Sequence, residues 1–282
     1  MPQSGSVERH GGAQLGLGCS RLGSALTRSQ ETPEALLLAA YKAGIRYFDT
    51  ADIYGQGDSE RFIGRTVAHL PQARICTKVG QRFPLKMRLL LPIKAPLKRL
   101  ASLSPAVAAR VKAARAGTLP TSFEPAYLAG ALEKSLKRLG VDAVDTVMLH
   151  GATAQEIASG TPIGVLDGLR ERGLFRRLGV SCEDLDGAEA ALADPRVAVA
   201  QIPLHFGDLR ARDIAARLAD RGIEVIAREI LTGSAVHNAE PPAARQHALR
   251  MALDAALHAP GVSVALLGTT SSAHLLEAVE AL

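Results

Sequence analysis

Four ionisable residues lie at or near the ends of short apolar runs, where they could act together in chemistry. Asp49 and Tyr54 lie in FDTADIYG, Lys78 lies in ICTKVG, and His150 ends VMLH. A buried charge without a partner is costly, so we expect Asp49 and Lys78 to pair. An ammonium beside a phenol favours the tyrosinate, which makes Tyr54 a better proton donor at neutral pH. A neutral His150 imidazole can donate a hydrogen bond to a carbonyl oxygen.

These residue types indicate a reaction class. No nucleophile–base pair accompanies them in the sequence, and no cluster of His, Cys and Asp has the spacing of metal ligands. Proton donation without covalent or metal chemistry predicts the reduction of a carbonyl group by hydride from a cofactor. Taken singly, Asp49 also suits a helix-capping turn, Lys78 a structural ion pair and His150 a hydrogen-bonded core histidine. Their occurrence together at successive strand ends favours catalysis.

The elements that must position these residues follow a repeating order of amphipathic stretch, glycine and β-branched run. Lys42-Ala43-Gly44 precedes IRYFDTA, for example, and Asp220-Arg221-Gly222 precedes IEVIAREI. Glycine just past a helix adopts the left-handed cap at little cost. Because parallel strands need crossover connections, the alternation predicts a parallel α/β sheet. We expect strands near 14–19, 46–51, 74–79, 144–150, 175–181, 197–203, 223–230 and 262–268. We expect helices near 32–43, 59–70, 125–139, 162–172, 186–193, 211–221, 244–258 and 272–281.

Eight strands and eight helices are the count of a (β/α)8 TIM barrel, in which active sites lie at the carboxyl ends of the strands. An open doubly wound sheet is the alternative, but it usually has a glycine-rich phosphate loop after its first strand. Here that turn is GLGCSR, with Arg21 in place of the third glycine. We therefore predict a single α/β domain over residues 1–282, a TIM barrel with a long inserted loop after the third strand.

The predicted insertion, residues 81–122, is strongly basic. From Arg61 to Phe123 the chain has thirteen Lys or Arg and no Asp or Glu, within a net charge of +5 for the whole chain. A βα loop normally spans about 2–6 residues. We interpret the insertion as a partly helical lid over the barrel mouth. Recruitment of an acidic partner, an anionic substrate or a membrane surface is a second interpretation. A nucleic-acid interface is disfavoured, because the segment matches no binding module.

The composition is that of a globular protein from a reducing compartment. Apolar residues make up 47% and charged residues 22%, which predicts a well-buried core. Three cysteines are too few and odd in number for a disulfide framework. We find no apolar run of membrane-spanning length, and residues 1–10 lack the apolar core of a signal peptide. We therefore expect a cytoplasmic location; the oligomeric state is left open.

The segment GIRYFDTADIYGQGDSERFIGRTV resembles the opening signature of the aldo-keto reductases, G-x-R-x-F-D-T-A-x-x-Y-G followed by S-E-x-x-x-G. The resemblance extends to SLKRLGVDAVDTVMLHG, RRLGVS and LLGTTSSAHLLEAVEAL, and so to most of residues 12–282. It implies an NADP(H)-dependent oxidoreductase, with NAD(H) possible. Hydride would pass between the nicotinamide and an aldehyde, ketone or sugar lactol, without a metal. Asp49, Tyr54, Lys78 and His150 would be the catalytic tetrad, with Tyr54 the general acid/base.

The resemblance also implies a nicotinamide site, with two departures. Ser181, Cys182 and Gln201 match the residues that hold the carboxamide, but Cys182 replaces an Asn. Arg228 replaces the aromatic residue that stacks on the nicotinamide ring. A guanidinium also stacks on flat rings, so this change is a variation of the contact.

The rest of the cofactor is expected further along the chain. Leu231 and Gly233 match the stretch along the pyrophosphate. The adenosine phosphate is expected at the start of the last helix, because a helix N-terminus favours phosphate. The residues implied there are Gly268, Thr269, Thr270, Ser271, His274 and Glu277. In many relatives an Arg binds the 2′-phosphate here. Because this Arg is absent, the resemblance favours NADP over NAD only weakly.

An alternative function is a cofactor-binding regulator or scaffold on the same barrel, like the potassium-channel β subunits. The complete tetrad favours the enzyme, although those relatives can retain it too. The sequence ends just after the last expected helix, before the long loop that closes the pocket in many relatives. We expect the insertion to supply that wall, so the choice among carbonyl and sugar substrates is left open.

Overall fold

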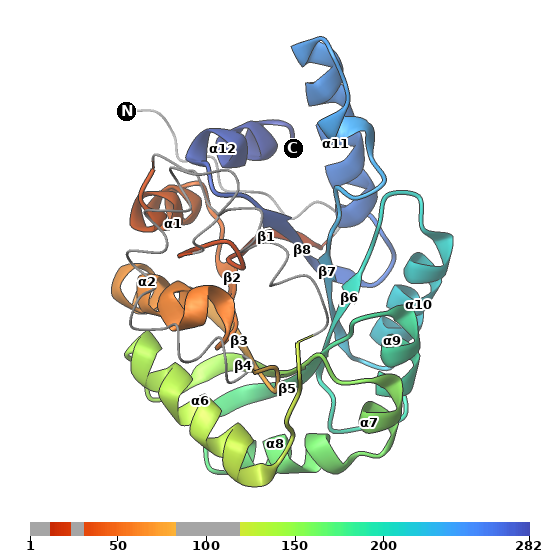
Figure 1. The fold of residues 1–282 in the computed structure, drawn as a ribbon. Coiled ribbons are helices and arrows are strands. Elements are labelled where there is room, and N and C mark those ends of the chain that lie inside the picture. The colour runs from red at the N-terminus through yellow and green to blue at the C-terminus, as the bar shows by residue number, and fades with distance from the viewer. Residues whose placement is uncertain (1–11, 24–30, 83–118) are drawn as a thin grey trace, which may run out of the picture.

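A closed barrel of eight parallel strands forms the centre of the molecule (Figure 1). The computed structural model describes residues 12–23, 31–82 and 119–282. The strands follow one another in sequence order, and the last pairs with the first. They are β1 (Gln14–Gly18), β2 (Tyr47–Asp49), β3 (Arg74–Val79), β4 (Val144–His150), β5 (Phe175–Ser181), β6 (Val199–Pro203), β7 (Glu224–Arg228) and β8 (Val262–Gly268). The predicted TIM barrel is confirmed.

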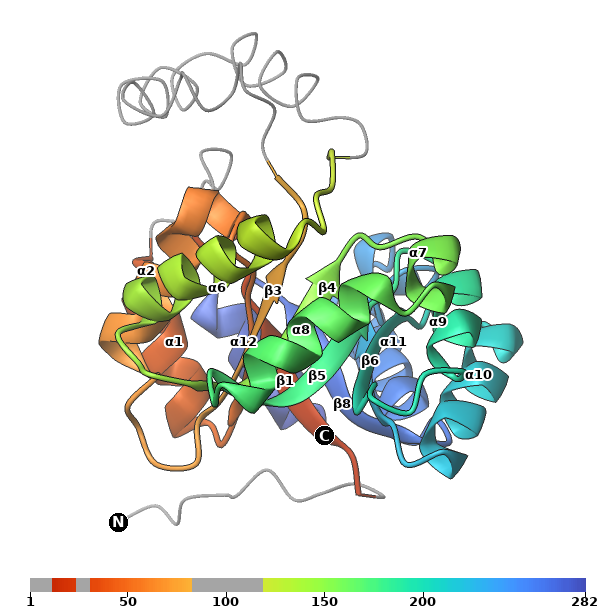
Figure 2. The same ribbon diagram turned by 90° about the horizontal axis from the view of Figure 1, so that it is seen from below.

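Helices surround the strands on the outside of the barrel (Figure 1). In the described part of the chain they are α1 (Pro33–Lys42), α2 (Asp58–Thr66), α6 (Pro125–Leu139), α7 (Ala154–Ala158), α8 (Thr161–Glu171), α9 (Leu185–Ala191), α10 (Leu209–Asp220), α11 (Pro242–Leu257) and α12 (Ser272–Glu280), with the short 3-10 helices η1 (Tyr54–Gly57) and η3 (Ala235–His237). α6 and α8 lie side by side, α6 against β3 and α8 against β4 and β5 (Figure 2). The strands are therefore covered by helices, as parallel strands require.

Several elements differ from the expectation; α2, for example, ends at Thr66 rather than near residue 70. β2 ends at Asp49, because the chain turns there into the 3-10 helix that carries Tyr54. The helix α7 was not predicted, because five residues are too few for a helical pattern to show. Its start is marked by a capping box, in which the Thr153 side chain accepts from the Glu156 N–H and the Glu156 side chain accepts from the Thr153 N–H.

The ends of the predicted insertion meet in an isolated bridge between Gln81 and Thr121. Residues 83–118, on which the lid prediction falls, lie outside the described residues.

The barrel interior is layered from its amino end to its carboxyl end. At the amino end, Glu224 accepts a hydrogen bond from Arg74 at 2.9 Å and pairs with Arg177 as well. We call these three residues the amino-end ion triad. Above them lies an apolar layer of Tyr47, Cys76, Met148, Val199, Ile226, Val264 and Leu266. The charged side chains of the site come next, so the apolar layer separates the two polar ends.

The contact between α2 and α6 depends on Gly64. A Cβ on Gly64 would lie 2.5 Å from the carbonyl oxygen of Leu139, far inside normal contact. We expect Gly64→Ala to lower the free energy of unfolding by about 1–3 kcal/mol, because the two backbones must separate. Gly130→Ala is the matched control, since a Cβ on Gly130 in α6 meets nothing within 4 Å. That change should leave the protein as stable or more stable. Denaturant unfolding followed by circular dichroism measures both, and equal stability of the two variants would contradict the close approach.

Candidate active site

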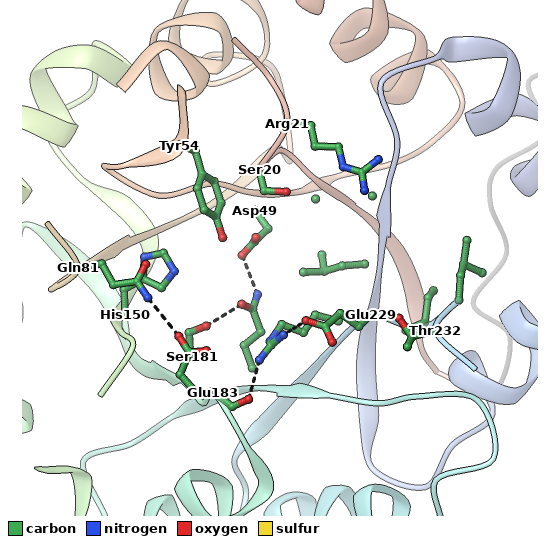
Figure 3. Close-up of a pocket in the computed structure, with 17 residues that line it drawn as sticks. Ser20, Arg21, Asp49, Tyr54, Gln81, His150, Ser181, Glu183, Glu229 and Thr232 are labelled. Atoms are coloured by element: carbon green, nitrogen blue, oxygen red, sulfur yellow. Dashed lines mark hydrogen bonds and ion pairs between the residues drawn. The ribbon is translucent and has the colours of Figure 1, made fainter. Parts of the chain in front are cut away.

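A pocket of about 500 Å³ opens at the carboxyl ends of the strands (Figure 3). This volume lies within the usual range for small-molecule sites. The predicted residues that line it are Asp49, Tyr54, His150, Ser181, Gln201, Arg228, Leu231 and Gly268. Further lining residues, which the sequence analysis did not assign to a site, are Gly18, Ser20, Arg21, Gln81, Glu183, Glu229, Ile230, Thr232 and Leu266.

Lys78 lies behind the pocket and is fully buried. Its Nζ donates to Asp49 Oδ2 at 2.7 Å and to the Thr50 carbonyl oxygen at 2.9 Å. Burial alone lowers the pKa of Lys78, but the attraction of Asp49 outweighs it and holds the pKa above its usual value. Lys78 is therefore an ammonium, and the expected ion pair is present.

Tyr54 is brought back over the strand end by an unusual turn. The three residues that follow it all have positive φ: Gly55 at 58°, Gln56 at 63° and Gly57 at 87°. A Cβ on Gly55 would lie 2.7 Å from the Leu22 carbonyl oxygen, so both space and φ require glycine there. The turn places the Tyr54 ring centroid 5.0 Å from Lys78 Nζ.

The pKa of Tyr54 differs from the expectation. Burial raises the pKa above its ordinary value, and the Lys78 ammonium lowers it by less. The lysine does not dominate, because much of its charge is opposed by Asp49, which itself raises the pKa of the phenol. Tyr54 is therefore a protonated phenol at neutral pH, with a cation close by.

His150 faces Tyr54 across the pocket (Figure 3). The two rings meet edge to face, with their centroids 5.7 Å apart. Burial, and then the charges of Lys78 and Arg228, hold the pKa of His150 well below its usual value. The imidazole is therefore neutral, as its expected role requires. Its Nδ1 is buried and has no hydrogen-bond partner among the described residues.

A line of hydrogen bonds connects this group to the far side of the pocket. Gln201 Nε2 donates to Asp49 Oδ1 at 2.8 Å, and Ser181 Oγ donates to Gln201 Oε1 at 2.9 Å. Asp49 thus holds Lys78 with one oxygen and Gln201 with the other. Two of the residues expected to hold a carboxamide are fixed in position at the pocket.

The third, Cys182, points elsewhere. Its side chain is fully buried in the core between the strands and the helices, where it packs beside Gly187. Burial raises the pKa of this thiol to about 12, so it is neither a thiolate nor a polar contact for a ligand. The structure does not bring the Cys182 side chain to the pocket.

Arg228 links two of the loops at the mouth. Its Nη2 donates to the carbonyl oxygens of Cys182 and Glu183, at 2.9 and 3.1 Å. Its Nη1 pairs with Glu229, which also lies 2.9 Å from His205 Nε2. The guanidinium is thus held in the lining of the pocket. The expectation for Arg228 was that it stacks on the nicotinamide ring.

Most of the predicted phosphate residues lie outside the pocket lining. Thr269, Thr270 and Ser271 connect β8 to α12, and Ser271 caps that helix by accepting from the His274 N–H at 3.4 Å. Glu277 Oε2 accepts from Arg245 at 2.8 Å. Gly233 likewise lies outside the lining, whereas Leu231 and Gly268 belong to it. No Lys or Arg occurs from Gly268 to Glu277.

No metal centre is found among the described residues, which contain no cluster of three His, Cys, Asp or Glu able to hold an ion. In the same part of the chain, no helix is both long enough and apolar enough to cross a membrane.

Known proteins show the family to which this barrel belongs. The model of the aldo/keto reductase family matches residues 14–248, and the chain belongs to this family. The 6-dehydroglucose reductase of Novosphingobium aromaticivorans is 30% identical over 283 residues, which cover 88% of this chain and 79% of that protein. The uncharacterized oxidoreductase YqkF of Bacillus subtilis is 25% identical over 219 residues, which cover 77% of this chain. The chain spans 60% of the length of YqkF.

Solved structures confirm the fold. An aldo-keto reductase from Klebsiella pneumoniae, determined in complex with NADPH, superimposes with a TM-score of 0.63 at 22% identity. The match covers 95% of this chain and 84% of that one. At this identity the likeness concerns the barrel alone.

Proposed function

We propose that this chain is an NADP(H)-dependent oxidoreductase that reduces an aldehyde or ketone, or oxidises a sugar lactol in the reverse direction. The observation that carries the proposal is the position of Tyr54 and His150 on a pocket of about 500 Å³, with the buried Lys78–Asp49 pair behind them. The NADPH in the Klebsiella structure and the sugar named in the Novosphingobium relative support it.

The residues at one end of the pocket fit a nicotinamide. Ser181 and Gln201 offer a hydroxyl and an amide beside Tyr54, and Arg228 offers a flat cation. When bound, NADPH supplies the hydride that adds to the carbonyl carbon. The polar turn from Gly268 to Ser271 would hold the adenosine phosphate through backbone N–H groups and hydroxyls rather than through a cation. NAD(H) is therefore the alternative cofactor.

The tetrad can supply the proton and stabilise the charge. Tyr54 would donate its phenolic proton to the carbonyl oxygen, and the Lys78 ammonium would stabilise the tyrosinate that remains. Asp49 holds Lys78 at 2.7 Å and keeps it charged. The neutral His150 would donate a hydrogen bond to the same carbonyl oxygen and orient it. None of these steps needs the Cys182 side chain.

The first test of the proposal is binding followed by turnover. Calorimetric titration with NADPH and with NADH should show binding, tighter for NADPH. A panel of aldehydes and sugars should then change the nicotinamide absorbance. Failure to bind either nucleotide would contradict the proposal. Binding without turnover of any substrate would favour the regulatory or scaffold protein on the same barrel.

A further inference from the structure

Gln81 and Glu183 form a polar wall beside the proton-donating residues. Gln81 follows β3 and is only 8% exposed, and Glu183 follows β5 and is exposed. The Gln81 Nε2 donates to Glu183 Oε1 at 3.1 Å, and both residues line the pocket. Figure 3 shows Gln81 beside His150, with Glu183 across the lower edge of the pocket. We call these two residues the Gln81–Glu183 pair.

The Gln81 side chain is held close to the reacting end of the pocket. A Cβ on Gly151 would lie 2.7 Å from Gln81 Nε2, so the amide rests on the backbone next to His150. The Tyr127 hydroxyl donates to the Gln81 carbonyl oxygen at 3.0 Å. The bridge to Thr121 fixes the same stretch of backbone from its other side. The amide is therefore preorganised, and a substrate does not have to order it.

The pair retains hydrogen-bonding capacity that faces the pocket. A glutamine side chain has two N–H donors and one carbonyl acceptor, and the contact with Glu183 uses one donor. The second carboxylate oxygen of Glu183 is a further acceptor. Among the described lining residues, aromatic rings come only from Tyr54 and His150. An alkyl or aryl substrate would cover the remaining donor and acceptors without pairing with them, whereas hydroxyl groups would pair with them.

We propose that the Gln81–Glu183 pair is the specificity site of this enzyme and that it binds hydroxyl groups on the carbons next to the reacting carbonyl. The inference rests on the proposed reductase function and names its substrate class: polyhydroxylated aldehydes and ketones, that is, sugars and their short analogues. A site built to pair with substrate hydroxyls discriminates strongly against analogues that lack them, because its own polar groups are then left unpaired. Glu183 accepts from a hydroxyl, and Gln81 both donates and accepts.

The test compares D-glyceraldehyde with propanal, three-carbon aldehydes that differ by two hydroxyl groups. The quantity measured is the ratio of their kcat/KM values with NADPH. We expect Glu183→Ala to lower this ratio about 10-fold, since a hydrogen bond to a charged group is lost. Gln81→Met, which keeps the size of the side chain, should lower it similarly. Glu171→Ala is the matched control: it removes the same charge from an exposed position at the end of α8, and the ratio should not change.

Each outcome of this comparison supports or overturns the assignment of the Gln81–Glu183 pair. A fall of the ratio in both pocket variants but not in the control supports the pair as the specificity site. A ratio that stays at the wild-type value in Glu183→Ala overturns it, whatever the fate of Gln81→Met, because an exposed Glu183 can be replaced without loss of the fold. A wild type that reduces neither aldehyde, nor any other carbonyl in the panel, shows instead that the proposed function fails, and the inference fails with it.

Discussion

Replacing Tyr54 with Phe is expected to lower kcat/KM for aldehyde reduction by about 10²–10⁴-fold, the usual contribution of a general acid. The change removes only the phenolic hydroxyl. The ring that faces His150 at 5.7 Å is kept, and so is the Lys78–Asp49 pair. Binding of NADPH should therefore stay close to wild type. Steady-state kinetics with the best aldehyde and calorimetric titration with NADPH measure the two effects separately.

Tyr41→Phe is the control for this loss. The Tyr41 hydroxyl donates to the Pro71 carbonyl oxygen at 3.0 Å, and Tyr41 is absent from the pocket lining. Its removal should leave turnover unchanged. If Tyr54→Phe retained wild-type turnover, the proton would have to come from another group, and the proposed role of Tyr54 would be abandoned.

Lys78→Met is expected to abolish turnover and to destabilise the fold. The change leaves Asp49 buried without its cation, and breaking a buried pair from one side typically costs about 3–5 kcal/mol. Asp49 is 4% exposed, so water compensates poorly for the lost ammonium. Denaturant unfolding measures the loss of stability, and the nicotinamide absorbance measures turnover.

A second replacement separates stability from catalysis. Adding Asp49→Asn to Lys78→Met removes the unpaired charge, so the double variant should regain much of the stability but none of the activity. Arg65→Met serves as the surface control. Arg65 pairs with Glu34 at 2.5 Å in a solvent-exposed position, where an ion pair contributes little. Equal destabilisation by Lys78→Met and Arg65→Met would show that the buried pair is not needed for stability.

The barrel could be predicted because helix caps and strand composition are local signals. The alternation of amphipathic stretches and β-branched runs gave eight strands within a few residues of their observed bounds. The ends of elements were predicted less accurately, because tertiary contacts decide where an element stops. β2 stops at Asp49 because the next residues form the turn that carries Tyr54. The capping box of Thr153 and Glu156 is visible in the sequence, but five residues are too few for a helical pattern to support it.

Only those residues of the candidate site that lie at strand ends could be predicted from the sequence. Asp49, Lys78 and His150 end or nearly end their strands, and adjacent strands bring such ends together. Gln81 and Glu183 lie in loops, where no periodic pattern tells which side chains meet. The family resemblance matches Cys182 to a carboxamide-binding residue, although successive residues of an extended chain face opposite sides. Since Ser181 lines the pocket, that alternation alone would have directed Cys182 into the core.

The position of the amino-end ion triad has a consequence for which parts of this protein can be replaced. Glu224 and Arg74 are the first residues of their strands, and the apolar layer lies between the triad and the pocket. The ion triad and the pocket thus lie at opposite ends of the barrel. Barrels of this kind vary their reactions through the loops at the carboxyl ends of the strands. We therefore expect that the stretches after β5 and β7 can be exchanged with those of another barrel without disturbing the amino-end ion triad. For this chain, we expect that substrate selectivity can be changed by replacing loops at the carboxyl end of the barrel, without altering the core.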